Sequence, residues 1–163
     1  VTMANVRKAL HAGSWYTDKS EVLEKQLRTY LESAQPGTLK KVAPGGRLRA
    51  LIGPHAGYSY SGKTAAYGYV DIDPTQVKKI FLLGPSHHVY LDGCAVSGAK
   101  KYETPIGDIE VDNEVCRALE RTGHFQRMNL RVDEEEHSLE MHLPYIAHVM
   151  KGHEFTLVPI MVG

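Results

Sequence analysis

The sequence has no long run of apolar residues and no excess of charge of either sign. Its 163 residues carry 19 basic and 19 acidic side chains, so the formal net charge is zero. No apolar segment approaches the ~18 residues that a transmembrane helix requires. A neutral chain also lacks the bulk charge that holds nucleic acid or an anionic membrane surface. We therefore expect no membrane span and no nucleic-acid partner.

Cysteine is scarce, because Cys94 and Cys116 are the only two in the sequence. Two thiols do not make the disulfide framework of a small secreted domain, which favours a reducing, cytoplasmic setting. They have no CxxC spacing and no basic neighbour that would activate a thiolate. We expect both to be buried structural residues.

The motifs of several large enzyme classes are missing as well. The sequence contains no GxSxG nucleophile elbow, no phosphate-binding P-loop and no GxGxxG after a predicted strand. These absences count against a serine hydrolase, a nucleotide kinase and a Rossmann dehydrogenase.

Short apolar runs alternate instead with segments of helical spacing. This alternation predicts an α/β fold with a mostly parallel central sheet flanked by helices. The last apolar run closes the chain, and because a core strand is seldom the final element we expect further residues beyond Gly163. The predicted strands are 48–53, 79–84, 94–98, 109–111 and 155–163, and the predicted helices are 20–33, 62–69, 113–122 and 138–150, with a polar loop at 35–46.

Two of the predicted strands end in similar loops that each carry histidine. GPHAGY contains His55, and GPSHH contains His87 and His88. The ends of neighbouring parallel strands lie within ~5 Å of each other and form the usual ligand crevice, so histidines from both loops could converge there. Adjacent residues of an extended chain point opposite ways, so one of His87 and His88 is expected to take part. Two imidazoles suit iron, copper or zinc, whereas the simpler alternative is a pair of hydrogen-bonded turn residues.

A second cluster of ionisable residues lies in the segment EEEHSLEMH, 134–142. His137, Glu140 and His142 could orient metal ligands or transfer protons behind them. His137 and His142 are five positions apart, which is not the spacing of the HExxH zinc motif. The alternative is a helix start, in which the acidic run lies at the positive end of the helix dipole and Ser138 caps the helix.

The segment HAGSWY contains the only tryptophan of the sequence, Trp15. The simpler interpretation is a packing anchor before the first helix. His11 could instead reach the histidine pocket, and we keep this as the less favoured alternative.

Four motifs of the sequence occur in the same order as in the Memo family (mediator of receptor-driven cell motility): HAGSWY, PHAGYSYSG, FLLGPSHHV and DEEEHSLEMHLPY. Two segments between them, YETPIGDIEVD and RTGHFQRM, also match sequences of this family. The chain resembles this family from His11 to Gly163. The resemblance implies a fold like that of the class III extradiol (LigB-type) dioxygenases, which hold non-haem iron with two histidines and a carboxylate. It also implies that His55 and His87 are metal ligands, and that residues 1–163 are the N-terminal half of a single Memo-like α/β domain.

In the Memo family the third ligand is a cysteine of the C-terminal half, and neither Cys94 nor Cys116 matches it. A thiolate is a soft ligand, so such a site tolerates Cu(I) as well as iron. The resemblance thus implies a copper- or iron-binding redox protein, a possible metal-dependent oxidoreductase linked to receptor signalling and cell motility. Two alternatives are a non-enzymatic adaptor that binds a phosphotyrosine peptide or signalling protein in the same crevice, and an extradiol dioxygenase, which needs an acidic third ligand.

Overall fold

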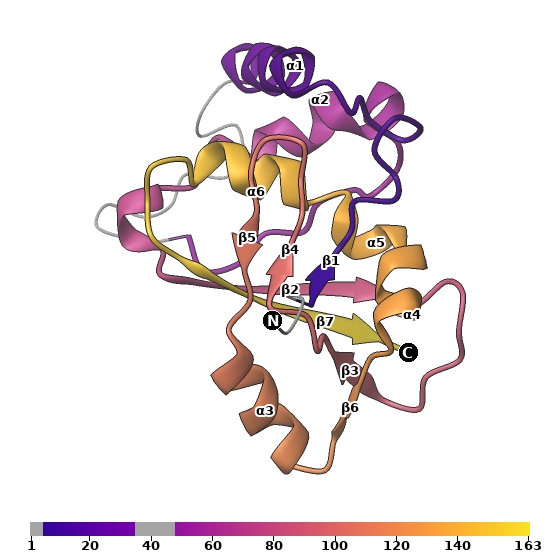
Figure 1. The fold of residues 1–163 in the computed structure, drawn as a ribbon. Coiled ribbons are helices and arrows are strands. Elements are labelled where there is room, and N and C mark those ends of the chain that lie inside the picture. The colour runs from indigo at the N-terminus through magenta and orange to yellow at the C-terminus, as the bar shows by residue number, and fades with distance from the viewer. Residues whose placement is uncertain (1–4, 35–47) are drawn as a thin grey trace.

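The computed structural model describes residues 5–34 and 48–163 and shows a mixed α/β fold (Figure 1). Its strands form a three-stranded sheet, ordered β1-β4-β5, and a four-stranded sheet, ordered β2-β7-β3-β6. Helices flank the two sheets. The strands are β1 (Val6–Arg7), β2 (Lys79–Pro85), β3 (Cys94–Val96), β4 (Lys101–Tyr102), β5 (Ile109–Glu110), β6 (Phe125–Arg127) and β7 (Thr156–Val162).

The larger sheet is mixed, and two of its three strand pairings are parallel, as expected. β7 pairs in parallel with β2 but antiparallel with β3, and β3 pairs in parallel with β6. β7 is an inner strand, and its residues 157–161 are all buried, which explains why this run is apolar on both faces. The smaller sheet is mixed too, since β4 is parallel to β1 and antiparallel to β5.

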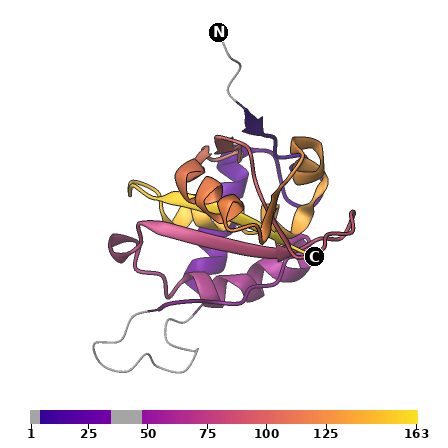
Figure 2. The same ribbon diagram turned by 90° about the horizontal axis from the view of Figure 1, so that it is seen from below.

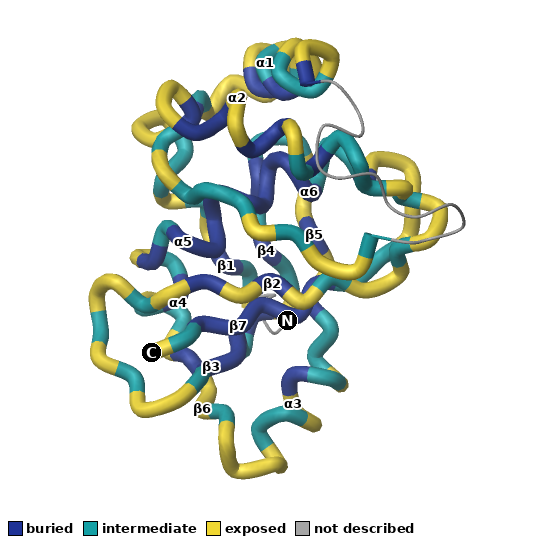
Figure 3. Tube along the Cα trace, turned by 180° about the vertical axis from the view of Figure 1, so that it is seen from behind, coloured by how far each residue is buried: buried dark blue, intermediate teal, exposed yellow. Residues whose placement is uncertain are grey.

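β2 differs from the expected doubly buried strand because it lies at the edge of its sheet. Leu82 faces the core, whereas Phe81 and Leu83 on the opposite face are 52% and 57% exposed. Buried and exposed positions alternate along this part of β2 (Figure 3). Its apolar composition therefore predicted the strand correctly but not its burial.

The strand predicted at 48–53 is wrong, because these residues belong to no sheet. The segment instead lies beside α2 (Tyr58–Tyr69), where the Leu51 side chain is next to Gly68, and Ile52 is exposed. Apolar composition makes a segment suitable for a sheet, but only a neighbouring backbone with free hydrogen-bonding groups makes it a strand. The predicted loop at 35–46 lies outside the described residues.

Every predicted helical segment contains a helix, although some bounds differ, and residues 130–135 form a further helix that was not predicted. The prediction for 20–33 is confirmed, and α2 begins four residues earlier than predicted. The segment predicted as one helix, 138–150, is divided between α5 (His137–Glu140) and α6 (Leu143–Val149). Pro144 lies in the first turn of α6, a position that tolerates its missing N–H, whereas a helix interior does not. The helices are α1 (Ser20–Ser33), α2 (Tyr58–Tyr69), α3 (Asn113–Arg121), α4 (Leu130–Glu135), α5 (His137–Glu140) and α6 (Leu143–Val149), with a short 3-10 helix at Pro74–Gln76.

The main core lies between the four-stranded sheet and a layer of three helices, α1, α2 and α6, which contact one another (Figure 2). Leu23 and Leu27 of α1 and Tyr145 of α6 are completely buried in it. No helix of the described residues is both long and apolar enough to span a membrane.

A close approach between α5 and the end of β2 positions the candidate site. A Cβ atom added to Gly84 of β2 would lie 2.6 Å from the Oγ of Ser138 and 3.0 Å from a methyl carbon of Leu139. Glycine therefore lets the first turn of α5 pack directly on the strand, next to the loop that follows β2.

Candidate metal centre

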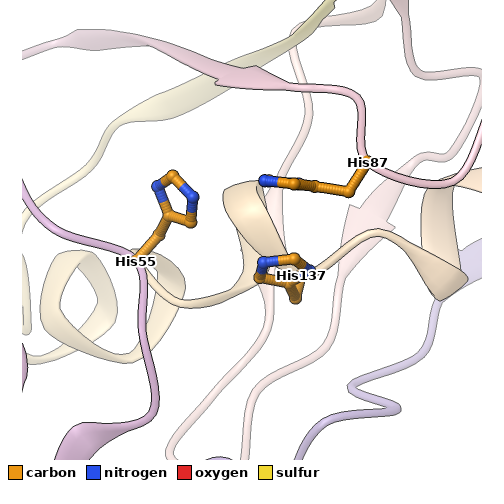
Figure 4. A group of neighbouring side chains, drawn as sticks. All are labelled: His55, His87 and His137. Atoms are coloured by element: carbon orange, nitrogen blue, oxygen red, sulfur yellow. The ribbon is translucent and has the colours of Figure 1, made fainter. Parts of the chain in front are cut away.

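Three histidines from three separate segments converge at one point (Figure 4). His55 precedes α2, His87 follows β2 and His137 begins α5. Each offers a ring nitrogen, and the three nitrogens lie within 4.8 Å of one another. The ring centroids are 5.3 Å apart for His55 and His87, 4.3 Å for His87 and His137, and 5.6 Å for His55 and His137. We call this group the three-histidine cluster.

His55 reaches the cluster by a route that differs from the expected one. It follows no strand but lies in the turn that leads to Gly57, the N-cap of α2. Tyr58 N–H, at the start of this helix, donates to the carbonyl of Trp15 at 2.9 Å. A Cβ on Gly57 would lie 3.3 Å from that carbonyl oxygen, so a glycine allows the two segments to approach each other.

Glu136 holds the histidine that follows β2. Its Oε1 accepts from His87 Nδ1 at 2.9 Å, and its Oε2 accepts from the His87 backbone N–H at 2.7 Å. Glu136 also caps α5 by accepting from the N–H of Ser138. Burial alone would raise the pKa of Glu136, but these hydrogen bonds outweigh it and lower the pKa to about 2. An ionised Glu136 at His87 Nδ1 leaves Nε2 as the ring nitrogen for a metal ion.

His137 lies within the cluster itself, whereas the sequence indicated a role behind the ligands. Its ring stacks on that of His87, with centroids 4.3 Å apart, and lies 4.4 Å from the tilted ring of Trp15. Burial lowers the pKa of His137, and the neighbouring histidines lower it further against the opposing effect of Glu136. Neutral imidazole is the form that binds metal, so these surroundings suit a ligand.

Glu140, predicted to stand behind the metal ligands, contacts none of the three histidines through a hydrogen bond. Its carboxylate is completely buried and binds Arg7, the Tyr16 hydroxyl at 2.8 Å and His11 Nδ1 at 2.8 Å. Burial would raise the pKa of Glu140, but the His11 hydrogen bond and the Arg7 charge lower it overall. Glu140 therefore orients His11.

Arg7, which the sequence did not indicate, ties β1 to the segment that carries Glu136. Its buried guanidinium donates to the backbone carbonyls of Asp133 at 3.0 Å and Glu136 at 2.9 Å. The carboxylate of Asp133 in turn accepts from Tyr102 at 2.6 Å. This network immobilises the backbone on which His137 stands.

His142 was expected near the metal, but the structure pairs it with Tyr69 of α2. The Tyr69 hydroxyl lies 2.8 Å from His142 Nδ1, and His142 is only 7% exposed. Burial, with a smaller effect from His55, lowers the pKa of His142 to about 4. A neutral, buried imidazole with a tyrosine partner fits a structural role.

A pocket of about 470 Å³ adjoins the cluster on the side of His137. His11 and Trp15 line this adjoining pocket, and His11 is not a member of the three-histidine cluster. His88 also lines this pocket and is not a member of the cluster. Its lining residues are Leu10, His11, Trp15, His88, Glu135 and His137.

The two cysteines are free thiols and neither belongs to the three-histidine cluster. Cys116 is buried, as expected, and burial raises the pKa of its thiol to about 11. Cys94 is only half-buried.

Comparison with known proteins places these features in one family. A family model described as "Memo-like protein" matches residues 7–163. "Protein MEMO1" of Danio rerio and of Homo sapiens are each 48% identical to the chain over 159 residues, covering 96% of this chain and 51% of the relative. "Protein memo-1 homolog" of Caenorhabditis elegans is 46% identical over 159 residues, covering 98% of this chain and 43% of its own length. The chain therefore spans about half the length of these relatives.

Proposed function

The chain belongs to the Memo-like protein family, and we propose that its three-histidine cluster binds a copper or iron ion in a redox protein. The observation that supports this proposal is the convergence of His55, His87 and His137, whose ring nitrogens lie within 4.8 Å of one another. Imidazole nitrogen is a common ligand of copper, iron and zinc.

The surroundings of the cluster fit such an ion. His55, His87 and His137 would hold it, and Glu136 orients the His87 ring through Nδ1. A carboxylate behind a metal-binding histidine fixes the tautomer and the direction of the ring. A bound copper or iron ion would supply one-electron chemistry.

The proposal extends to the complete protein. The C-terminal half expected from the family resemblance would add a cysteine to the three imidazoles, and a thiolate would favour Cu(I). The two halves together would form a domain like that of the extradiol dioxygenases. A cytoplasmic location and a link to receptor signalling and cell motility are part of the same proposal.

Anaerobic titration of the full-length protein with Cu(I) and with Fe(II), against a competing chelator, tests the proposal. We expect one tight site that is lost in His55→Ala and in His87→Ala. His153→Ala, which changes an exposed histidine outside the site, is the matched control and leaves the site intact. Unchanged affinity in both cluster variants would overturn the metal assignment, and binding of a phosphotyrosine peptide to the crevice would then be tested.

A further inference from the structure

The four-stranded sheet has an open edge at β2, which pairs only with β7 among the described residues. The N–H of Ser86, just past β2, donates to the carbonyl of Val162 at 2.7 Å, and the carbonyl of Lys78, just before β2, accepts from β7 at 3.1 Å. Alternate residues of a strand direct their backbone groups to the same side. The even-numbered residues of β2 therefore face β7. The N–H groups of Phe81 and Leu83 point to the open edge, where no described backbone group accepts from them.

The side chains along this edge are apolar and carry little protection against pairing with another strand. Phe81 and Leu83 are 52% and 57% exposed. Edge strands are usually protected by charged side chains or proline, because their unpaired N–H and C=O groups can pair with another strand. Lys79 is the only charged residue of β2, and its ammonium is held 2.7 Å from the carboxylate of Asp112. Pro85 protects only the end of the strand. The centre of β2 is thus suited to be covered.

The open edge leads directly to the three-histidine cluster. His87 follows β2 by two residues, and its side chain is 37% exposed. The segment 48–53, which leads to His55, is uncovered as well, because Ile52 is fully exposed. The rings of His55 and His87 lie 5.3 Å apart, so the two uncovered apolar segments converge at the cluster. A polypeptide that covered β2 would pass beside the proposed metal ligands.

The lengths of the relatives indicate which polypeptide this is. The chain corresponds to about half of each relative, so a second half of similar length accompanies the matched part in those proteins. A segment of the same molecule is present at a high effective concentration, whereas a separate partner has to be captured from solution.

We propose that in the full-length protein a strand of the C-terminal half pairs with the open edge of β2, from Lys79 to Leu83, and packs on Phe81 and Leu83. The inference shares with the proposed function the expected C-terminal half, but it does not depend on metal binding. A strand meets both needs of this edge. Its backbone supplies partners for the outward N–H and C=O groups, and its side chains cover the apolar ones. A helix laid on the same face would leave the backbone groups of the edge without partners.

Amide hydrogen exchange on the metal-free full-length protein, resolved by residue with NMR, tests the pairing. Ile80 and Leu82, whose N–H groups face β7, are the internal reference. We expect the amides of Phe81 and Leu83 to exchange as slowly as this reference, within about tenfold. Exchange that is faster than this would overturn the proposal. Protection that disappears on dilution would assign the edge to a second copy of the chain and would overturn it too.

Leu83→Lys tests the packing on the face of β2. A lysine is harmless on an uncovered edge strand, whereas under a covering strand it brings a charge into an apolar contact. We expect the Tm of the full-length protein to fall by about 5 °C or more. Val22→Lys on α1 is the matched control, since Val22 is 56% exposed, and its Tm should change by less than about 2 °C. A smaller fall in Leu83→Lys, or one no larger than in Val22→Lys, would overturn the proposal.

The outcome is separate from that of the metal titration, because both measurements use metal-free protein. Tight metal binding together with a rapidly exchanging β2 edge would leave the proposed function in place and overturn this inference. A protected β2 edge in a protein that binds no metal would support this inference and contradict the proposed function.

Discussion

Glu136 holds His87 at two points, since its carboxylate accepts from both the ring Nδ1 at 2.9 Å and the backbone N–H at 2.7 Å. The same carboxylate accepts from the N–H of Ser138 at 2.8 Å. One buried side chain therefore joins the end of β2 to the start of α5, the two elements that carry His87 and His137. Glu136 thus links the positions of His87 and His137 within the cluster.

Replacing Glu136 with glutamine should weaken metal binding. The amide has nearly the same size but carries no charge, so it no longer stabilises a donating Nδ1–H on His87. We expect affinity for Cu(I) to fall by about 10- to 100-fold, as for other residues behind metal ligands. Chelator competition measures the change. Glu154→Gln, at an exposed position, should bind as the wild type does.

Removing Arg7 should be strongly destabilising. In Arg7→Met the buried carboxylate of Glu140 loses its counter-charge, and the carbonyl of Glu136 loses its donor. We expect the free energy of unfolding in urea to fall by about 3–5 kcal/mol. Arg7→Met combined with Glu140→Gln should recover part of this loss because no unpaired charge remains. If Arg7→Met alone lowered the free energy of unfolding by less than about 1 kcal/mol, the ion pair would not be a stabilising element.

His142 makes stability depend on pH between about 6.5 and 4. Burial lowers its pKa to about 4, whereas the unfolded chain protonates it near 6.5. In this window the unfolded state binds more protons, so the contribution of His142 is complete above the unfolded pKa and is lost as pH falls toward the folded one. The loss reaches about 3 kcal/mol at most.

Urea unfolding at pH 7 and pH 5 measures this effect. The double variant His142→Phe with Tyr69→Phe removes the imidazole without leaving the tyrosine hydroxyl unpaired. Its stability should depend less on pH than that of the wild type, although His137, whose pKa is also lowered, leaves part of the slope. If the free energy of unfolding of the double variant depended on pH as steeply as that of the wild type, the burial of a neutral His142 would be contradicted.

Alanine substitutions at two glycines, Gly84 and Gly68, should change the stability of the protein in opposite directions. A Cβ on Gly84 would lie 2.6 Å from the Oγ of Ser138, so Gly84→Ala should push α5 away from β2 and cost about 1–3 kcal/mol. Gly68 lies inside α2, and its Cβ would meet Leu51 only at 3.7 Å. Gly68→Ala should therefore stabilise the protein by about 0.5–1 kcal/mol. Thermal unfolding of both variants measures the two stability changes. If both variants were stabilised, or both destabilised, the result would contradict the packing described for Gly84 and Gly68.

The sequence by itself determined the elements whose residues carry a local signal. Helical spacing located α1 and α3, and continuous apolar runs located β2 and β7. The Gly-Pro loops around His55 and His87 marked two histidines that do lie side by side, with ring centroids 5.3 Å apart. Local patterns are reliable here because helix and strand periodicity depends on nearby residues.

Only the tertiary structure decided which distant side chains meet. The run of charges at 134–142 contains a cluster member, His137, two carboxylates that orient different histidines, and His142, which pairs with Tyr69. Spacing along the chain could not distinguish these roles, because a buried polar group takes whichever partner the packing brings to it. The same reason applies to residues 48–53, whose apolar composition suits a strand but which pair with no neighbouring backbone in the described structure.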